Sequence, residues 1–540
     1  MSTTTLLTAA AGTNVGEPWL NMLIFGLFVA VTLVIVLRAS KNTKTAADYY
    51  AGGRSFSGTQ NGTAIAGDYL SAASFLGIVG AIALTGYDGF LYSIGFFVAW
   101  LIALLLVAEP LRNTGKFTMA DVLSFRLKQR PVRVAAAFAT LFVSLFYLVA
   151  QMAGAGSLVS VLLDIHEKSG QAIVVAIVGI IMIAYVLIGG MKGTTYVQMI
   201  KAVLLIGGVI IMTIIIFVAV KGNFSQLLTE AVQAHGGNEA ILEPGMKYAE
   251  SDTSKLDFIA LGLSLALGVA GLPHVLMRFY TVPTAKEARK SVTWAIVLIG
   301  GFYLLTLFLG YAAAAWVGPE TIKNAPGGAN AAAPLLALEL AGPIFMALIS
   351  AVAFATVLAV VAGLAITASA SVAHDFYNSV LRNGEATEEE QVRVSRITVV
   401  IIGLVAIVLG IGAMGQNVAF LVSLAFCIAA SANVPTILYS LYWKRFNTTG
   451  AVCSLWVGLL SALILILLSP AVSGAETSML PNADFAIFPL SNPGLITIPL
   501  GFLAGIVGTY IGKPDNFDDL QAEMEVRSLT GVGVEAAVDH

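Results

Sequence analysis

The 540-residue chain is 58% hydrophobic and only 11% charged, with a mean hydropathy of +0.88. A soluble globular domain carries roughly a quarter charged residues, so most of this chain cannot face water and a lipid bilayer is the solvent that suits it. The net charge of −3 gives no reason to expect a nucleic-acid partner. No GxxxxGK[ST] phosphate loop is present, which disfavours ATP-driven transport by this chain alone.

Apolar stretches long enough to cross a bilayer recur from about residue 18 to residue 512. A hydrocarbon core of about 30 Å needs about 20 apolar residues per helix. On this criterion the sequence predicts an all-α polytopic membrane protein with about thirteen transmembrane helices. The expected spans are 18–38, 58–86, 87–109, 132–163, 170–190, 196–220, 256–281, 290–317, 338–373, 394–413, 416–442, 450–470 and 492–512. The long 338–373 span could begin with a turn before Gly342 and Pro343.

The basic residues are distributed unevenly between the two sides of these spans. If the N-terminus lies outside, most of the 28 Lys and Arg residues fall in cytoplasmic connections and in the C-terminal tail. This is the positive-inside asymmetry. It predicts an inner-membrane protein with an extracytoplasmic N-terminal tail (1–17) and a cytoplasmic acidic tail (513–540), which we expect to be a solvated or disordered end and not a domain.

The second span carries an acidic residue near its middle. Asp68 is flanked by Gly67, Ser71 and Ser74, which are poor or indifferent helix formers. An ionisable group inside a span is costly, and it marks a candidate functional site. A helix that unwinds here would free carbonyl groups for a cation and direct a half-helix N-terminus at an anion. The alternative is a polar patch packed against neighbouring helices.

The seventh span contains a second potential break. Pro273 follows Gly268 and Gly271, and proline removes a backbone donor from the helix. Interrupted segments at matching places in two halves of opposite direction indicate inverted repeats around a midplane site. Next to the break, His274 could carry a proton or donate a hydrogen bond across a helix interface. Arg278 is expected nearer the cytoplasmic end, as an anchor or a gate pair.

Three further polar positions could line the same cavity. Tyr147 and Gln151 lie one turn apart on one face of the fourth span, where they could bind a substrate or join two helices. Thr356 lies in an apolar part of the ninth span. Its hydroxyl and nearby carbonyls suit an alkali cation, although such residues are also common at helix interfaces.

Five motifs follow one another along the chain: Asp48-Tyr49-Tyr50-Ala51-Gly52-Gly53-Arg54, Gly67-Asp68-Tyr69-Leu70-Ser71-Ala72-Ala73-Ser74-Phe75-Leu76-Gly77, Gly189-Gly190-Met191-Lys192-Gly193, Gly271-Leu272-Pro273-His274-Val275-Leu276-Met277-Arg278-Phe279-Tyr280 and Ser371-Val372-Ala373-His374-Asp375. Together they resemble the sodium/solute symporter family, in its acetate (monocarboxylate) permease branch. The resemblance covers the proposed transporter domain, residues 18–512. It implies a LeuT-like five-plus-five inverted repeat, with a first repeat at 58–220, a second at 256–442 and peripheral helices at 450–512.

The resemblance also implies alternating access driven by a cation gradient, and it suggests which residues bind. A Na+ site would use oxygens of the second and ninth spans. Asp68 is added as a further candidate, and the expected cation-binding residues are therefore Gly67, Asp68, Leu70, Val352, Ala355 and Thr356. The expected substrate-binding residues are Ser71, Ala72, Ser74, Tyr147, Gln151, Gly271 and His274. The substrate carboxylate would meet half-helix N-termini around Ser71–Ser74.

One departure from the family pattern bears on the coupling ion. Many sodium-coupled relatives have an Asp near the inner end of the sixth span, where this chain has Gln198 followed by Lys201. Lys201 could extend to the cytoplasmic interface. The coupling ion is therefore expected to be either Na+ or H+.

The sequence as a whole predicts a symporter that imports acetate, propionate, pyruvate or a similar small monocarboxylate. The alternatives are a sodium symporter for another small solute, such as proline or a sugar, and a passive anion channel. No nucleophile–base pair and no cluster of metal-ligating His and Cys stands out along the chain, so we expect neither an enzyme nor a bound cofactor. The oligomeric state is left open.

Overall fold

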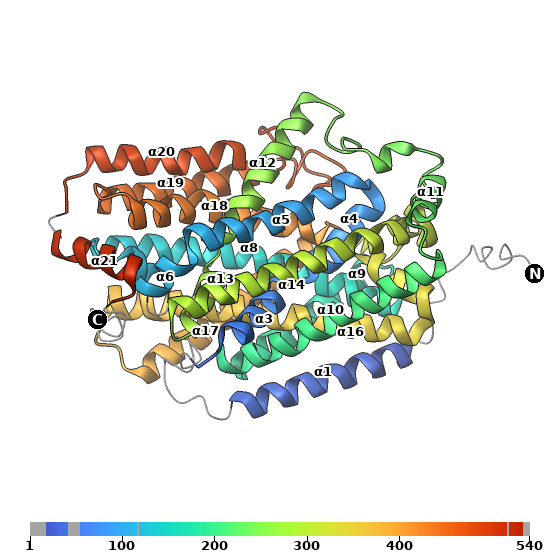
Figure 1. The fold of residues 1–540 in the computed structure, drawn as a ribbon, viewed down its shortest axis with the longest axis horizontal. Coiled ribbons are helices and arrows are strands. Elements are labelled where there is room, and N and C mark those ends of the chain that lie inside the picture. Colours follow the sequence, from blue (N-terminus) through green and yellow to red (C-terminus); the bar gives the residue numbers. More distant parts are fainter. Residues whose placement is uncertain (1–17, 41–54, 116–117, 189–190, 516–517, 533–540) are drawn as a thin grey trace, which may run out of the picture.

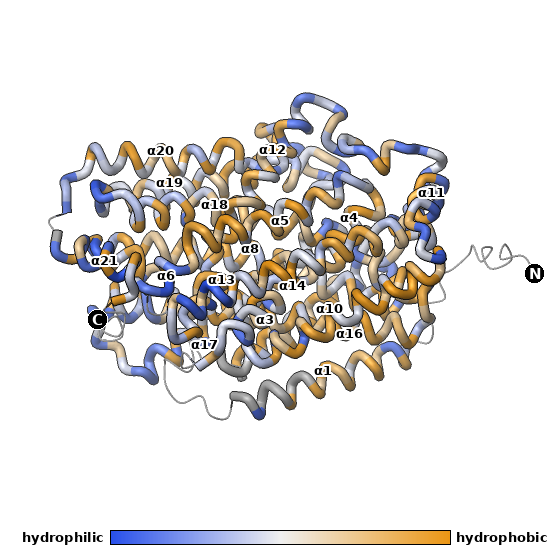
Figure 2. Tube along the Cα trace, viewed as in Figure 1, coloured by the Kyte–Doolittle hydropathy of each residue, from blue (hydrophilic) through white to orange (hydrophobic). Residues whose placement is uncertain are grey.

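The computed structural model describes residues 18–40, 55–115, 118–188, 191–515 and 518–532. Regular structure in these ranges is helical, apart from one isolated β-bridge between Ser473 and Leu480. The long helices run side by side in one bundle, with α1 along one edge and α19 and α20 along the opposite edge (Figure 1). Apolar residues follow the lengths of these helices, and polar residues gather at the connections (Figure 2). The structure confirms the all-α polytopic class.

The long helices lie close to the expected spans. Their bounds are α1 (Pro18–Ser40), α3 (Gly58–Tyr69), α4 (Ile78–Thr85), α5 (Tyr87–Leu106), α8 (Gln129–Leu163), α9 (Lys168–Ile188), α10 (Met191–Ala219), α12 (Asp252–Gly268), α14 (Ala285–Ala312), α16 (Ala332–Ala370), α17 (Glu388–Gly412), α18 (Val418–Tyr442), α19 (Thr448–Leu467) and α20 (Gly494–Ile511). Shorter helices lie between or after them: α6 (Ala108–Thr114), α7 (Met119–Leu123), α11 (Phe224–Ala234), α13 (Pro273–Met277), α15 (Pro319–Asn324) and, at the C-terminal end, α21 (Asp518–Thr530).

The expected count of thirteen spans is not confirmed. Within the described ranges, eleven helices are long and apolar enough to cross a membrane, and the bent pair formed by residues 58–69 and 73–85 makes up to twelve. The apolar part of α1, Pro18–Val31, is shorter than a full span. The most buried spans contain α16 and α18, with 83% and 94% of their apolar windows inside the protein. These two helices therefore form the centre of the bundle.

The predicted break in the second span is confirmed. α3 begins at a capping box made by Ser57 and Gln60, and it ends at Tyr69. The chain bends by 60° before the helical segment Ala73–Thr85, which opens with the π-helical turn η3 (Ala73–Gly77). The break lies inside the protein, where Leu70 and Ser71 are both buried.

A close contact between α3 and α10 explains why Gly67 precedes this break. A Cβ atom added at Gly67 would lie 2.1 Å from the carbonyl oxygen of Gln198. Even alanine therefore forces the two helix backbones apart.

We expect Gly67→Ala to lower the free energy of unfolding by about 1–3 kcal/mol, the usual cost of overpacking. Thermal unfolding of the detergent-purified protein measures the effect. Gly207→Ala on α10 is the matched control, because a Cβ atom there meets nothing within 4 Å. Equal melting temperatures for the two variants would contradict this account.

The break in the seventh span is confirmed too. α12 passes through the short 3-10 turn η5 (Val269–Gly271) to Leu272, which is extended, and Pro273 then begins α13. Proline suits this first helical position, where its missing N–H would be unpaired anyway. The freed carbonyl of Gly271 accepts a hydrogen bond from Asn433 Nδ2 on α18 at 2.8 Å.

The expected turn near the start of the ninth span is also present. α16 is interrupted at Ala341 and Gly342, and the φ angle of Gly342 is +81°. This is a left-handed conformation that glycine adopts without strain. Pro343 follows directly, so the long apolar segment divides at the position that the sequence indicated.

The C-terminal tail differs from the expected solvated end. Residues Asp518–Thr530 form α21, and Asn113 Nδ2 donates to Ser528 O at 3.1 Å. The guanidinium of Arg527 lies 5.2 Å from the ring centroid of Phe125. Arg527 is 3% exposed, so this part of the tail is packed against the connection that contains α6 and α7.

Candidate functional site

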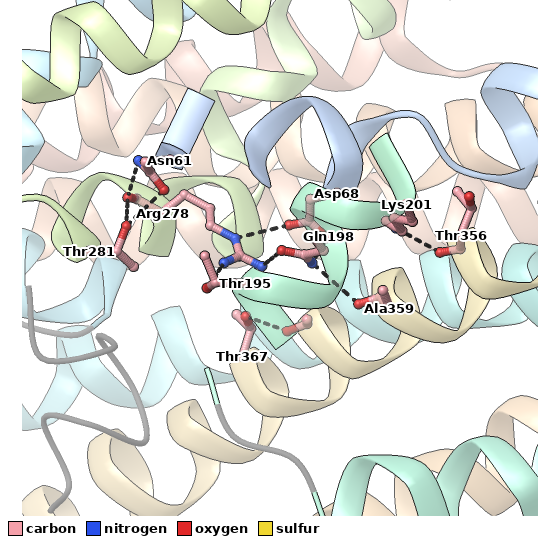
Figure 3. A network of polar contacts seen from close by, with 11 residues as sticks. Asn61, Asp68, Thr195, Gln198, Lys201, Arg278, Thr281, Thr356, Ala359 and Thr367 are labelled. Carbon is pink, nitrogen blue, oxygen red and sulfur yellow. Dashed lines mark hydrogen bonds and ion pairs between the residues drawn. The ribbon is translucent and has the colours of Figure 1, made fainter. Parts of the chain in front are cut away.

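The Asp68 carboxylate lies at the end of α3, within a network of buried polar side chains (Figure 3). Gln198 Nε2 donates to Asp68 Oδ1 at 2.8 Å, and Arg278 Nε donates to Asp68 Oδ2 at 3.4 Å. The side chains of the ion pair are 2% and 1% exposed. A second Arg278 nitrogen, Nη2, donates to Gln198 Oε1. The charge of Asp68 is thus compensated inside the protein, as a buried ion requires.

Arg278 is the residue that joins the two broken spans to α10. Its Nη1 donates to Thr195 Oγ1 at 2.7 Å, and its carbonyl oxygen accepts from Asn61 Nδ2 at 3.0 Å. The sequence predicts Arg278 nearer the cytoplasmic end, as an anchor or a gate pair, and gives no role to Thr195. An available signal was Asp68 itself, because an acidic group within a span needs a basic partner.

Lys201 lies one turn beyond Gln198, and its side chain is turned into the protein. The residue is 2% exposed, and its Nζ donates to the carbonyl oxygen of Thr356 at 2.9 Å. It therefore does not extend to the membrane interface. Gln198 Nε2 also lies 3.4 Å from the carbonyl oxygen of Ala359. The side chains of Gln198 and Lys201 thus link α10 to α16.

The six expected cation-binding residues are all buried, on two elements that α10 connects. Gly67, Asp68 and Leu70 lie at the α3 break, and Val352, Ala355 and Thr356 lie on α16. Two of the oxygens on α16 are already engaged, because Thr356 Oγ1 donates to Val352 O at 3.0 Å and Thr356 O accepts from Lys201. The Na+ assignment stays a prediction.

Three of the expected substrate-binding residues have buried polar groups and lie toward the bundle centre. Tyr147, Gln151 and His274 are 1%, 0% and 2% exposed. The rings of Tyr147 and His274 meet edge to face, with centroids 5.2 Å apart. Both amide atoms of Gln151 and both ring nitrogens of His274 lack a hydrogen-bond partner among the described residues. Unpaired buried polar atoms are rare and costly, so these four indicate a place for a polar ligand.

The remaining expected substrate-binding residues have structural contacts near these unpaired polar atoms. Ser74 Oγ donates to Tyr69 O at 3.1 Å and lies 3.0 Å from the Tyr303 hydroxyl. Ser71 Oγ accepts from the backbone of Ala73. These hydroxyl groups stabilise the α3 break. Ala72 packs closely against Gly154 of α8, because a Cβ atom added to this glycine would lie 3.0 Å from the Ala72 Cβ atom.

Two residues that the sequence analysis did not select also border this region. The ring of Phe426, on α18, lies 6.3 Å from that of Tyr147 and 6.2 Å from that of Tyr69. Asn433, on the same helix, binds the Gly271 carbonyl through Nδ2, while its Oδ1 has no partner among the described residues. A polar amide within such a buried apolar helix was the signal available for Asn433.

A second charged cluster lies near the start of α8 and just beyond the end of α16. Arg133 Nη1 is 3.0 Å from Asp121 Oδ1 and 2.8 Å from Asp375 Oδ1. His374 Nε2 lies 3.6 Å from Asp121 Oδ1. Burial acts to raise the pKa of the Asp121 carboxyl, but the Arg133 guanidinium, His374 and the backbone N–H of Thr118 together outweigh it and hold this pKa well below its ordinary value. The stabilisation is therefore complete at neutral pH and is lost only in strong acid.

We expect Arg133→Leu to destabilise the protein by roughly 3–5 kcal/mol at neutral pH, because two partly or fully buried carboxylates lose their shared cation. Thermal unfolding at pH 7 measures the loss. Arg393→Leu removes an exposed guanidinium from α17 and serves as the control. If the two variants have the same melting temperature, the charged cluster contributes little to stability.

Comparison with known proteins adds sequence and structural relatives. A family model described as "Sodium:solute symporter family" matches residues 49–458. A monocarboxylic acid transporter of Corynebacterium glutamicum is 72% identical over 549 aligned positions and 100% of both chains. A Bacillus subtilis protein described as the uncharacterized symporter YwcA is 48% identical, over 96% of this chain and 100% of its own.

Two solved structures share the fold. A Na+-coupled sialic acid symporter, in a substrate-bound outward-open state, matches with a TM-score of 0.67 at 17% identity over 93% of this chain and 99% of its own. Mhp1, a nucleobase-cation-symport-1 family transporter in a closed conformation, matches with a TM-score of 0.51 at 11% identity over 92% and 100%. The likeness confirms the expected LeuT-like fold; the boundaries of the two repeats stay a prediction.

Proposed function

The chain belongs to the sodium:solute symporter family, and from this premise we propose that it imports a small monocarboxylate together with Na+ or H+ by alternating access. Acetate, propionate and pyruvate are the proposed substrates. The protein is a multi-pass membrane protein, and we place its N-terminus outside and its C-terminus in the cytoplasm. The asymmetric distribution of Lys and Arg supports this orientation.

The observation that carries the proposal is the set of unpaired polar atoms on Gln151 and His274. A carboxylate accepts hydrogen bonds only, and the Gln151 amide and a protonated ring nitrogen of His274 are both donors. The Tyr147 ring packs against that of His274, and the Phe426 ring lies beside that of Tyr147; both rings suit a short apolar group. These residues are nearly fully buried, which favours a small substrate over a large one.

The charges of the polar network also favour an anion. Arg278 and Lys201 are two buried basic side chains of this region, whereas the one carboxylate drawn with them, Asp68, is paired with Arg278 (Figure 3). A substrate anion would offset the excess positive charge. The name of the 72% identical relative, monocarboxylic acid transporter, supports the same substrate class.

The alternatives have less support. A proline substrate would bring an ammonium group, and the one carboxylate of this network is already engaged by Arg278 and Gln198. A channel needs a continuous path, whereas two broken spans favour a gated midplane site.

Uptake of [14C]pyruvate into proteoliposomes tests the proposal, with Na+ and pH gradients imposed separately. Unlabelled acetate and propionate are expected to compete, and proline and glucose are not. Protein-free liposomes give the passive leak of the free acid. Competition by proline or glucose alone would contradict the substrate class. Uptake that ignores both gradients and never exceeds the external concentration would indicate a channel.

A further inference from the structure

The ammonium of Lys201 has an unusual environment for a buried cation. The side chain is 2% exposed, and its one hydrogen bond among the described residues is to Thr356 O at 2.9 Å. An ammonium has three donors, and burying it with a single neutral acceptor is costly. Such a group is retained at a cost to stability, which points to a role in function.

The position of this ammonium coincides with the expected alkali-cation site. Thr356 is the hydroxyl residue of that site, and its carbonyl oxygen already accepts from Lys201 Nζ. Gln198, one turn earlier on α10, contacts Asp68 and the Ala359 carbonyl, so it spans from the α3 break to α16. A sodium ion bound here would lie beside a second positive charge, and like charges at such separations repel strongly.

The carboxylate of the described network is not free to neutralise Lys201. Asp68 on α3 is the acidic group of the network, and it is paired with Arg278 of η6 (Arg278–Thr281). The stretch of α16 from Met346 to Ala370 has no titratable side chain, and Arg38 is the only titratable residue in α1. The titratable residues of α14 and α13 are Lys286, Glu287, Arg289, Lys290, Tyr303, Tyr311 and His274.

We propose that Lys201 is the proton carrier of the transport cycle and that its ammonium takes the place of a sodium ion against Thr356 O. In the substrate-loading state Lys201 is protonated, and its charge favours entry of the carboxylate. After the cytoplasmic side opens, the substrate leaves and the ammonium releases one proton to cytoplasmic water. The neutral amine then takes one proton from the extracytoplasmic side. One proton and one monocarboxylate thus move inward in each cycle, without net charge.

This inference rests on the proposed function, and one preparation tests both separately. Proteoliposomes contain a trapped pH dye, and [14C]pyruvate is supplied outside. An acidic exterior is expected to drive accumulation without Na+, with acidification of the interior beyond that in protein-free liposomes. A Na+ gradient at equal pH is expected to drive none. Accumulation that follows the Na+ gradient and ignores the pH gradient would overturn the inference.

Lys201→Arg tests the residue itself, because a guanidinium keeps its proton at every accessible pH. Gradient-driven accumulation is expected to fall roughly tenfold or more, while exchange of internal for external pyruvate falls by less. Lys290→Arg makes the same change at an exposed position of α14 and is the control. Retained pH-driven accumulation in Lys201→Arg would overturn the assignment. If the variant does not fold, the ion dependence of the wild-type protein decides the question.

The two proposals fail in different ways. If the wild-type protein exchanges no monocarboxylate at all, the proposed function is wrong. If exchange is present but accumulation depends on Na+, or survives Lys201→Arg, only the role of Lys201 is wrong.

Discussion

Arg278→Met is expected to abolish transport and to destabilise the protein by roughly 3–5 kcal/mol, because it leaves a buried carboxylate without its cation. The Arg278 side chain is 1% exposed and pairs with Asp68, which is 2% exposed. It also donates to Thr195 and Gln198, so the variant removes three hydrogen bonds that Arg278 donates. Thermal unfolding and [14C]pyruvate uptake measure the two effects.

A double variant separates the ion pair from the other contacts. Asp68→Asn combined with Arg278→Met removes both charges and is expected to recover much of the lost stability, since two neutral partners avoid the cost of an isolated charge. Arg289→Met is the exposed control. Arg289 pairs with Glu109 at 3.3 Å with its side chain 58% exposed, and such pairs contribute about 1 kcal/mol or less. If the double variant is no more stable than Arg278→Met, the ion pair is not the source of the loss.

Gln151→Leu is expected to have opposite effects on stability and on transport. Both amide atoms of Gln151 are buried and unpaired, and leucine has a similar size. Removing unpaired buried polar atoms is expected to stabilise the protein by about 1–3 kcal/mol. If Gln151 donates to the substrate carboxylate, uptake falls roughly tenfold to a hundredfold, as the loss of such a hydrogen bond implies.

The control for this prediction is a glutamine whose amide is paired. Gln171 Nε2 donates to Ile165 O at 2.9 Å near the start of α9, so Gln171→Leu is expected to lower the melting temperature slightly and to keep uptake. A Gln151→Leu protein that melts lower and transports normally would show that this amide has a structural role. General misfolding would lower both the melting temperature and the uptake, so it cannot produce the expected rise in stability together with the loss of transport.

The network around Asp68 also changes how the candidate site is understood. The sequence offered Asp68 as an isolated ionisable group and a candidate cation-binding residue. In the structure it accepts hydrogen bonds from both Gln198 and Arg278, so it is the ion-pair partner of Arg278 and not an isolated group. Lys201 is the buried charge that lacks such a partner among the described residues.

The sequence by itself determined the features that depend on neighbouring residues. Long apolar stretches predict the all-helical membrane class, and the glycine and proline positions predict the breaks near Asp68 and Pro273 and the turn at Gly342. These predictions hold because helix propensity and backbone sterics act within one short segment. The local patterns also selected Tyr147, Gln151 and His274 as polar residues of buried spans.

Only the tertiary structure decided which of these groups meet. Asp68 and Arg278 are 210 positions apart along the chain, and Lys201 meets Thr356 across 155 positions. No periodicity fixes such a pairing, since it depends on how whole helices pack. The direction of Lys201 is the clearest example. A long side chain on a membrane helix can extend toward water or turn inward, and the acceptor that α16 provides is a backbone carbonyl whose position only the packed bundle defines.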